Sequence, residues 1–65
     1  MKSTWKPIDV AGLRERLDMT QEELARALDV TVSTVCRWEN GHARPSKLAG
    51  RALDALAARV QQPTA

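Results

Sequence analysis

The sequence predicts an all-α fold, a compact bundle of four short helices, on three observations. Apolar residues recur at spacings of three and four in four separate segments of the chain. No segment alternates apolar and polar residues with the period of two that a half-buried strand requires. Capping and helix-ending residues stand between the four segments. The chain has 65 residues, so we expect a single small domain with a marginal core.

The first helix is expected over residues 10–18, with Asp9 as its N-cap. Val10, Leu13 and Leu17 fall on one side of this helix and predict a buried stripe. After Leu17 the helical period breaks.

The second helix begins with a capping box, in which Thr20 is the N-cap and Glu23 is the third helical residue. The helix is expected to end near Asp29. Its buried stripe consists of Leu24, Ala25 and Leu28.

A third helix over residues 32–40 follows a very short break, with Thr31 as its N-cap and Gly41 as the left-handed residue that ends it. A last helix over residues 47–61 begins after the N-cap Ser46. The apolar residues at helical spacing in this last helix are Leu48, Ala52, Leu53, Leu56, Ala57 and Val60.

The third helix has two faces that differ in character, as its residues turn by about 100° each. The inward face consists of Val35, Trp38 and Glu39. The outward face consists of Val32, Ser33, Cys36, Arg37 and Asn40. An unpaired inward carboxylate would be costly, and a valine that faces outward at the start of a helix is not expected to have a structural role. Both features fit two helices joined by a tight turn, with the second helix offered to the major groove of DNA.

The run TQEELARALDVTVSTVCRWENG, residues 20–41, resembles the helix-turn-helix of the phage-repressor and Cro type, also called the xenobiotic-response-element type. The matching features are the Thr-Gln-Glu opening, the Leu-Ala pair, the short turn and the Trp-Glu-Asn-Gly close, followed by Arg44-Pro45-Ser46. This motif covers 22 of the 65 residues, and the likeness extends over residues 8–61. It implies a lambda-repressor-like DNA-binding domain. Asp29 departs from the family, whose turns often carry Gly, although Asp tolerates positive φ better than most residues.

The resemblance implies a role for each of several positions. The positions that read base edges are Val32, Ser33 and Arg37, with Cys36 beside them. The positions that contact DNA phosphates are Gln21, Thr34, Asn40, Arg44 and Lys47. A structural ion pair joins Arg14 and Glu39.

Simpler interpretations stand beside these roles. Arg37 is otherwise a solvated surface arginine, but its guanidinium can fork onto guanine O6 and N7. Val32 is otherwise a surface residue, but it can pack on a thymine methyl group. Residues 37–65 carry a net charge of +3, which a solvated surface explains about as well as a polyanion partner does. Oxidation of Cys36 would alter the groove face, but a thiol in mid-helix lacks the field that makes it reactive.

We expect no metal, no cofactor and no enzymatic activity. The chain has one Cys and one His, too few for a metal site, and it has no paired acid and base and no Gly-rich phosphate loop. Its apolar runs are too short to cross a membrane, and its first residues do not form a signal peptide. A lone thiol suits a reducing compartment, so we expect a cytoplasmic protein without a membrane or small-molecule partner.

These features predict a sequence-specific regulator that binds double-stranded DNA, in particular a repressor on a near-palindromic operator. One such domain makes few contacts, so we expect a homodimer, formed through the Ala-rich last helix. The alternative is an antitoxin or protein-interaction module on the same fold, with DNA binding secondary. That alternative predicts a large exposed apolar patch.

The expected domain boundaries are an N-terminal arm at residues 1–7, the helix-turn-helix domain at 8–61 and a frayed C-terminus at 62–65. We expect Trp5 to pack on the helical core, while a basic arm that places Lys2 and Lys6 on DNA is the alternative.

Overall fold

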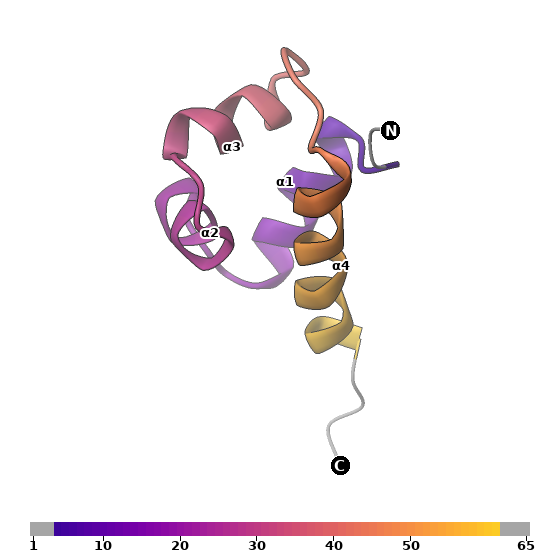
Figure 1. The fold of residues 1–65 in the computed structure, drawn as a ribbon. Coiled ribbons are helices and arrows are strands. Elements are labelled where there is room, and N and C mark those ends of the chain that lie inside the picture. Colours follow the sequence, from indigo (N-terminus) through magenta and orange to yellow (C-terminus); the bar gives the residue numbers. More distant parts are fainter. Residues whose placement is uncertain (1–3, 62–65) are drawn as a thin grey trace.

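The computed structural model describes residues 4–61, which fold into four α-helices (Figure 1). The helices are α1 (Pro7–Arg16), α2 (Gln21–Leu28), α3 (Val32–Glu39) and α4 (Lys47–Gln61). No strand occurs between residues 4 and 61, so the predicted all-α class is confirmed. None of the helices described is long and apolar enough to cross a membrane. Lys2 and the predicted frayed C-terminus, residues 62–65, lie outside the described residues.

All four helices contribute to one core. Within the described residues, the side chains that form this buried core are Val10, Leu13, Leu24, Ala25, Val35, Trp38, Leu53 and Leu56. Leu17 and Leu28, which the sequence assigns to buried stripes, are half-buried and pack against this cluster. The inward placement of Val35 and Trp38 is confirmed, because Val35 is fully buried and Trp38 is only 4% exposed.

The start of α1 differs from its prediction. The helix begins at Pro7, three residues before the expected position, and Lys6 rather than Asp9 is its N-cap. Proline suits the first helical position because its fixed φ is helical and its missing N–H would have no partner there. Asp9 instead occupies the third helical position, where its carboxylate accepts a hydrogen bond of 3.2 Å from the Lys6 N–H.

The caps of α2 and α3 are confirmed. Thr20 accepts from the Glu23 N–H at 3.1 Å, and the Glu23 carboxylate accepts from the Thr20 N–H at 2.8 Å. Thr31 caps α3 by accepting from the Thr34 N–H at 3.2 Å. Gly41 follows α3 with a φ of +80°, the left-handed conformation that glycine adopts without strain.

Leu48 is exposed, contrary to its place in the predicted apolar stripe of α4. Its exposed fraction is 76%, whereas Leu53 and Leu56 are buried. The core-facing line of α4 passes through the half-buried Ala49, which lies four residues before Leu53 and seven before Leu56. Leu48 lies about 100° away from that line, so its side chain points to solvent.

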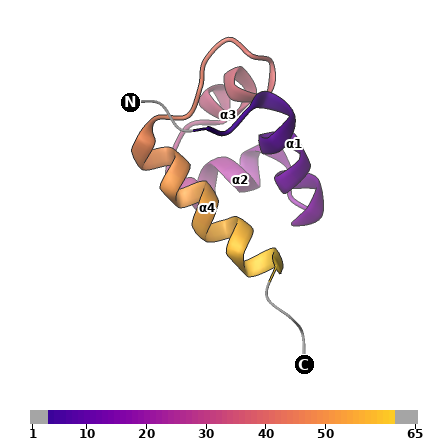
Figure 2. The same ribbon diagram turned by 90° about the vertical axis from the view of Figure 1, so that its right-hand side faces the viewer.

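Trp5 ties the segment before α1 to α4. It is half-buried against the core, and its indole Nε1–H donates a hydrogen bond of 2.8 Å to Oδ1 of Asp54. Figure 2 shows α1 and α4 on the near side of the molecule, with α2 and α3 behind them. The bond to Asp54 therefore links the segment before α1 to α4.

Candidate nucleic-acid interface

Helices α2 and α3 pack against each other across a turn of three residues, Asp29 to Thr31. Asp29 adopts the left-handed conformation, with φ of 57° and ψ of 43°. Asp, like Asn, reaches this region more readily than bulkier residues, so the sharp turn forms without the glycine that is common at this position. Val30 continues the turn, because its N–H donates to the Ala25 carbonyl at 2.9 Å.

The outward face of α3 is mostly accessible. Ser33, Arg37 and Asn40 are exposed, and Val32 is 40% exposed at the first position of the helix. Three of these four side chains are polar, and one of the three, Arg37, is positively charged. Because Val35 and Trp38 hold the opposite face in the core, the direction in which this face of α3 points is fixed.

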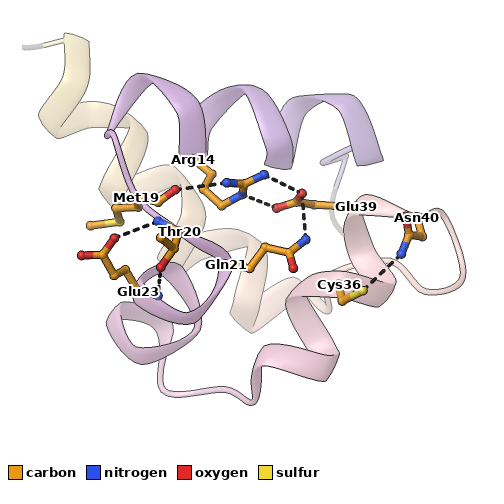
Figure 3. Close-up of polar contacts among 8 residues, drawn as sticks. All are labelled: Arg14, Met19, Thr20, Gln21, Glu23, Cys36, Glu39 and Asn40. Atoms are coloured by element: carbon orange, nitrogen blue, oxygen red, sulfur yellow. Dashed lines mark hydrogen bonds and ion pairs between the residues drawn. The ribbon is translucent and has the colours of Figure 1, made fainter.

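Cys36 is less accessible than its neighbours on the same face. It is half-buried, and the Asn40 side-chain amide donates a hydrogen bond of 3.2 Å to its sulfur (Figure 3). Asn40 lies one turn after Cys36, so this bond fixes the Asn40 side chain along the helix. The two side chains for which DNA contacts are predicted are therefore hydrogen-bonded to each other in the free protein.

Thr34 shares its hydroxyl group with the cap of α3. Its Oγ1 lies 2.9 Å from Oγ1 of Thr31, and it is half-buried. For the predicted phosphate contact, the Thr34 hydroxyl would have to donate its hydrogen to the phosphate and accept the hydrogen bond from Thr31.

Arg44 and Lys47 are exposed beyond the end of α3. Arg44 lies in the connection to α4, and Lys47 is the first residue of α4. Together with Arg37, in the last turn of α3, they provide three positive charges at and after the C-terminal end of this helix. Side chains of this kind neutralise phosphates and fix the register of a protein on DNA.

Gln21 is the first residue of α2, and its side chain reaches the end of α3. It is half-buried, and its Nε2 donates a hydrogen bond of 3.2 Å to Oε1 of Glu39 (Figure 3). Within residues 4–61 no protein group accepts from the backbone N–H of Gln21 or of Glu22. The first N–H groups of a helix attract anions, so this end of α2 can bind one.

Arg14 and Glu39 form a two-pronged ion pair between α1 and α3. Nε of Arg14 lies 2.7 Å from Oε2 of Glu39, and Nη2 lies 3.1 Å from Oε1. The side chains are 23% and 9% exposed, so water screens the pair less than it screens an ion pair on the open surface. Nη1 of Arg14 also donates to the Met19 carbonyl at 3.1 Å, immediately before the cap of α2.

The surroundings of the pair shift both pKa values toward the charged forms. Burial alone would raise the pKa of Glu39, but hydrogen bonds from Arg14 and Gln21 and the charge of Arg14 outweigh it, so this pKa lies below its ordinary value of 4.5. The hydrogen bond to Glu39 raises the pKa of Arg14 above its ordinary value. Glu39 is therefore ionised and neutralised by Arg14 at neutral pH.

The structure brings Arg14, Gln21 and Glu39 into contact, and it leaves Arg37, Arg44 and Lys47 as solvent-facing cations. The bond between Gln21 and Glu39 and the bond from Arg14 to the Met19 carbonyl were not predicted from the sequence. The inward phase of Glu39 was the one signal for the first of these bonds, because a carboxylate shielded from water needs several donors.

A family model described as Helix-turn-helix, of the Cro/C1 type, matches residues 10–58. The match covers 49 of the 65 residues and includes α2, the turn, α3 and the connection that carries Arg44. No curated protein and no solved structure matches the chain significantly.

Proposed function

Because the chain belongs to the phage-repressor and Cro type of the helix-turn-helix family, whose members are DNA-binding regulators of transcription, we propose that it is a sequence-specific repressor. It occupies a near-palindromic operator as a homodimer and reads bases through the major groove with α3. The observation that carries the proposal is the two-sided character of α3. Its core face holds the helix rigidly, and its opposite face offers Val32, Ser33 and Arg37 to solvent.

The proposed base contacts follow from the chemistry of this face. Arg37 donates two parallel hydrogen bonds to a guanine, Ser33 bonds to either kind of base edge, and Val32 packs on a thymine methyl group. Cys36 contributes a smaller apolar contact, because it is half-buried. The proposed phosphate contacts are made by Gln21, Thr34, Asn40, Arg44 and Lys47, and they position α3 without reading sequence.

The proposed dimer uses the outward side of α4. Leu48 is 76% exposed there, and the exposed Ala55 and Ala58 allow a second helix to approach closely. Two copies related by a two-fold axis would present two α3 helices to successive major grooves, about 34 Å apart. Such a protein needs no membrane, cofactor or small-molecule partner, and we expect it to act in the cytoplasm.

The polar outward face of α3 favours DNA over the alternative of a protein-interaction module or antitoxin. The exposed large apolar side chains of the described region, Ile8, Val32 and Leu48, lie on three different helices. They provide no single large patch on α3 where a protein partner would replace DNA.

Selection of binding sites from a pool of random duplexes tests the proposal. The protein is expected to enrich a short motif that occurs twice with two-fold symmetry, spaced by one helical turn. Enrichment of no motif at low salt, where phosphate contacts are strongest, would contradict the proposal. Enrichment of a single half-site would retain DNA reading and reject the dimer.

A further inference from the structure

Glu39 accepts hydrogen bonds from two different helices. Arg14 of α1 donates to both of its oxygens, at 2.7 and 3.1 Å, and Gln21 of α2 donates to Oε1 at 3.2 Å. We propose that Glu39, held in place by Arg14, positions the side-chain amide of Gln21 for a DNA phosphate. This inference rests on the proposed function, and it gives the ion pair a role in binding besides its role in stability.

The carboxylate determines which way the Gln21 amide points. An ionised carboxylate only accepts hydrogen bonds, so the amide must turn its nitrogen, and not its oxygen, toward Glu39. One N–H of the amide is then used by Glu39, and the second stays available. Together with the backbone N–H groups of Gln21 and Glu22, this second N–H provides three donors for an anion at the start of α2.

Those donors border an open hollow where α2 meets α3. The hollow is lined by Arg14, Thr20, Gln21, Glu22 and Val32. Val32 is the first residue of α3, so a phosphate in this hollow would lie beside the end of α3 that enters the groove first. A contact at this place fixes the depth and angle of α3 in the groove.

Arg14 makes Glu39 acceptable so close to a phosphate. A bare carboxylate would repel the DNA backbone, whereas the paired carboxylate adds no net charge. The side chain of Arg14 is 23% exposed and lines the same hollow, whereas Glu39 does not line it, so the positive member of the neutral pair lies nearer to a bound phosphate. The bond from Arg14 to the Met19 carbonyl fixes the chain immediately before α2 and thereby the direction of the free N–H groups.

Ordering the amide before binding raises affinity. A surface glutamine loses much rotamer freedom when it binds a ligand, and a residue already held in place loses little. Gln21 should therefore contribute more to DNA binding when Glu39 is present than when it is absent.

A double-mutant cycle with a random-sequence duplex at low salt tests this coupling, because phosphate contacts do not depend on sequence. One arm is Gln21→Ala, and the other is Arg14→Met with Glu39→Met, which removes both charges together and keeps apolar bulk. In the wild-type background Gln21→Ala is expected to weaken binding about tenfold. In the Met-Met background the same change is expected to weaken binding less than about twofold. Equal losses in the two backgrounds would overturn the proposal.

If the Met-Met variant does not fold, the NMR order parameter of the Gln21 side-chain amide in the free wild-type protein provides a second test. The side-chain amide of Gln21 is expected to be as ordered as the α2 backbone, with a nitrogen order parameter of about 0.85. A value below about 0.6 would mean a freely moving side chain and would overturn the proposal. If the wild type fails to bind the duplex at all, the proposed function fails and takes this inference with it. If it binds and the cycle is additive, this inference alone fails.

Discussion

The Nε atom of Arg14 lies 2.7 Å from Oε2 of Glu39 and joins the last turn of α1 to the last residue of α3. The contact spans 25 positions of the chain and links the first helix to the proposed recognition helix. Glu39 is only 9% exposed, so its charge depends on this partner.

Removing one member of the pair should therefore destabilise the fold strongly. Arg14→Ala leaves the Glu39 carboxylate shielded and without its partner, and it is expected to lower the free energy of unfolding by about 3–5 kcal/mol. A domain this small has little more than that to lose, so the melting temperature should fall sharply. Glu39→Ala should behave similarly, and thermal melts of both variants measure the effect.

The double variant Arg14→Ala with Glu39→Ala is the control for this prediction. Because it strands no charge, it should lose less stability than the sum of the two single changes. Additive losses would mean that the pair is not coupled and that it is worth no more than an exposed ion pair, about 0–1 kcal/mol.

The depressed pKa of Glu39 predicts a loss of stability in acid. The pKa is below 4.5 in the folded state and near its ordinary value in the unfolded state, so the unfolded state binds a proton first as the pH falls. The contribution of Glu39 is therefore fully present above about pH 5 and is lost as the pH falls through its folded pKa. Urea unfolding from neutral pH to about pH 3 measures this.

Arg14→Met with Glu39→Met is the matched comparison, because other carboxylates also titrate in this range. The wild type should lose more stability than this variant on acidification. Parallel losses would show that the pKa of Glu39 does not change on folding.

The hydrogen bond between Trp5 and Asp54 predicts a small effect on stability. Trp5→Phe keeps an aromatic ring against the core but cannot donate to Asp54, which is exposed and can bond to water instead. We expect a loss of about 0.5–1.5 kcal/mol in the free energy of unfolding. Trp5→Ala also removes the ring and should lower the free energy of unfolding further. The DNA affinity of the folded protein should be unchanged in both variants. A loss of DNA binding by folded Trp5→Phe would mean that the N-terminal segment belongs to the interface.

Arg37 and Lys47 should respond differently to removal. Arg37→Ala is expected to cost roughly 1–3 kcal/mol on the selected operator, to relax preference at one base pair and to change binding to random DNA much less. Lys47→Ala should weaken binding to all sequences alike, and it should lower the slope of log affinity against log salt by about one unit. Arg44→Ala serves as a second phosphate variant with the same expectation.

Titration of both duplexes at several salt concentrations checks this difference. Equal losses of Arg37→Ala on operator and random DNA would make Arg37 a phosphate contact. An unchanged salt slope for Lys47→Ala would remove Lys47 from the interface.

Features set by neighbouring residues were predictable from the sequence. The capping box of Thr20 and Glu23 depends on a spacing of three residues, and the opposite faces of α3 depend only on helical period. Gly41 after α3 follows from the same local chemistry, whereas the sequence showed only that Asp29 tolerates the left-handed conformation that it adopts.

The errors arose where two local signals competed or where distant parts meet. Asp9 is a good N-cap residue, but Pro7 at the first helical position set the start of α1 instead. Leu48 has helical spacing to Ala52, but only the packing of α4 decides that the core line runs through Ala49. The bond from Gln21 to Glu39 depends on how α2 and α3 are placed, which no local pattern contains.

Chemical-shift mapping with the selected duplex tests most directly that α3 is the surface that reads DNA. The NMR chemical shifts of the backbone amides of residues 4–61 are measured as the duplex is added. The largest changes are expected at residues 32–37 and at the start of α2, with smaller changes at Arg44 and Lys47. Changes concentrated on α1 near Ile8 and on the outward side of α4, with α3 unaffected, would contradict the proposal that α3 reads DNA.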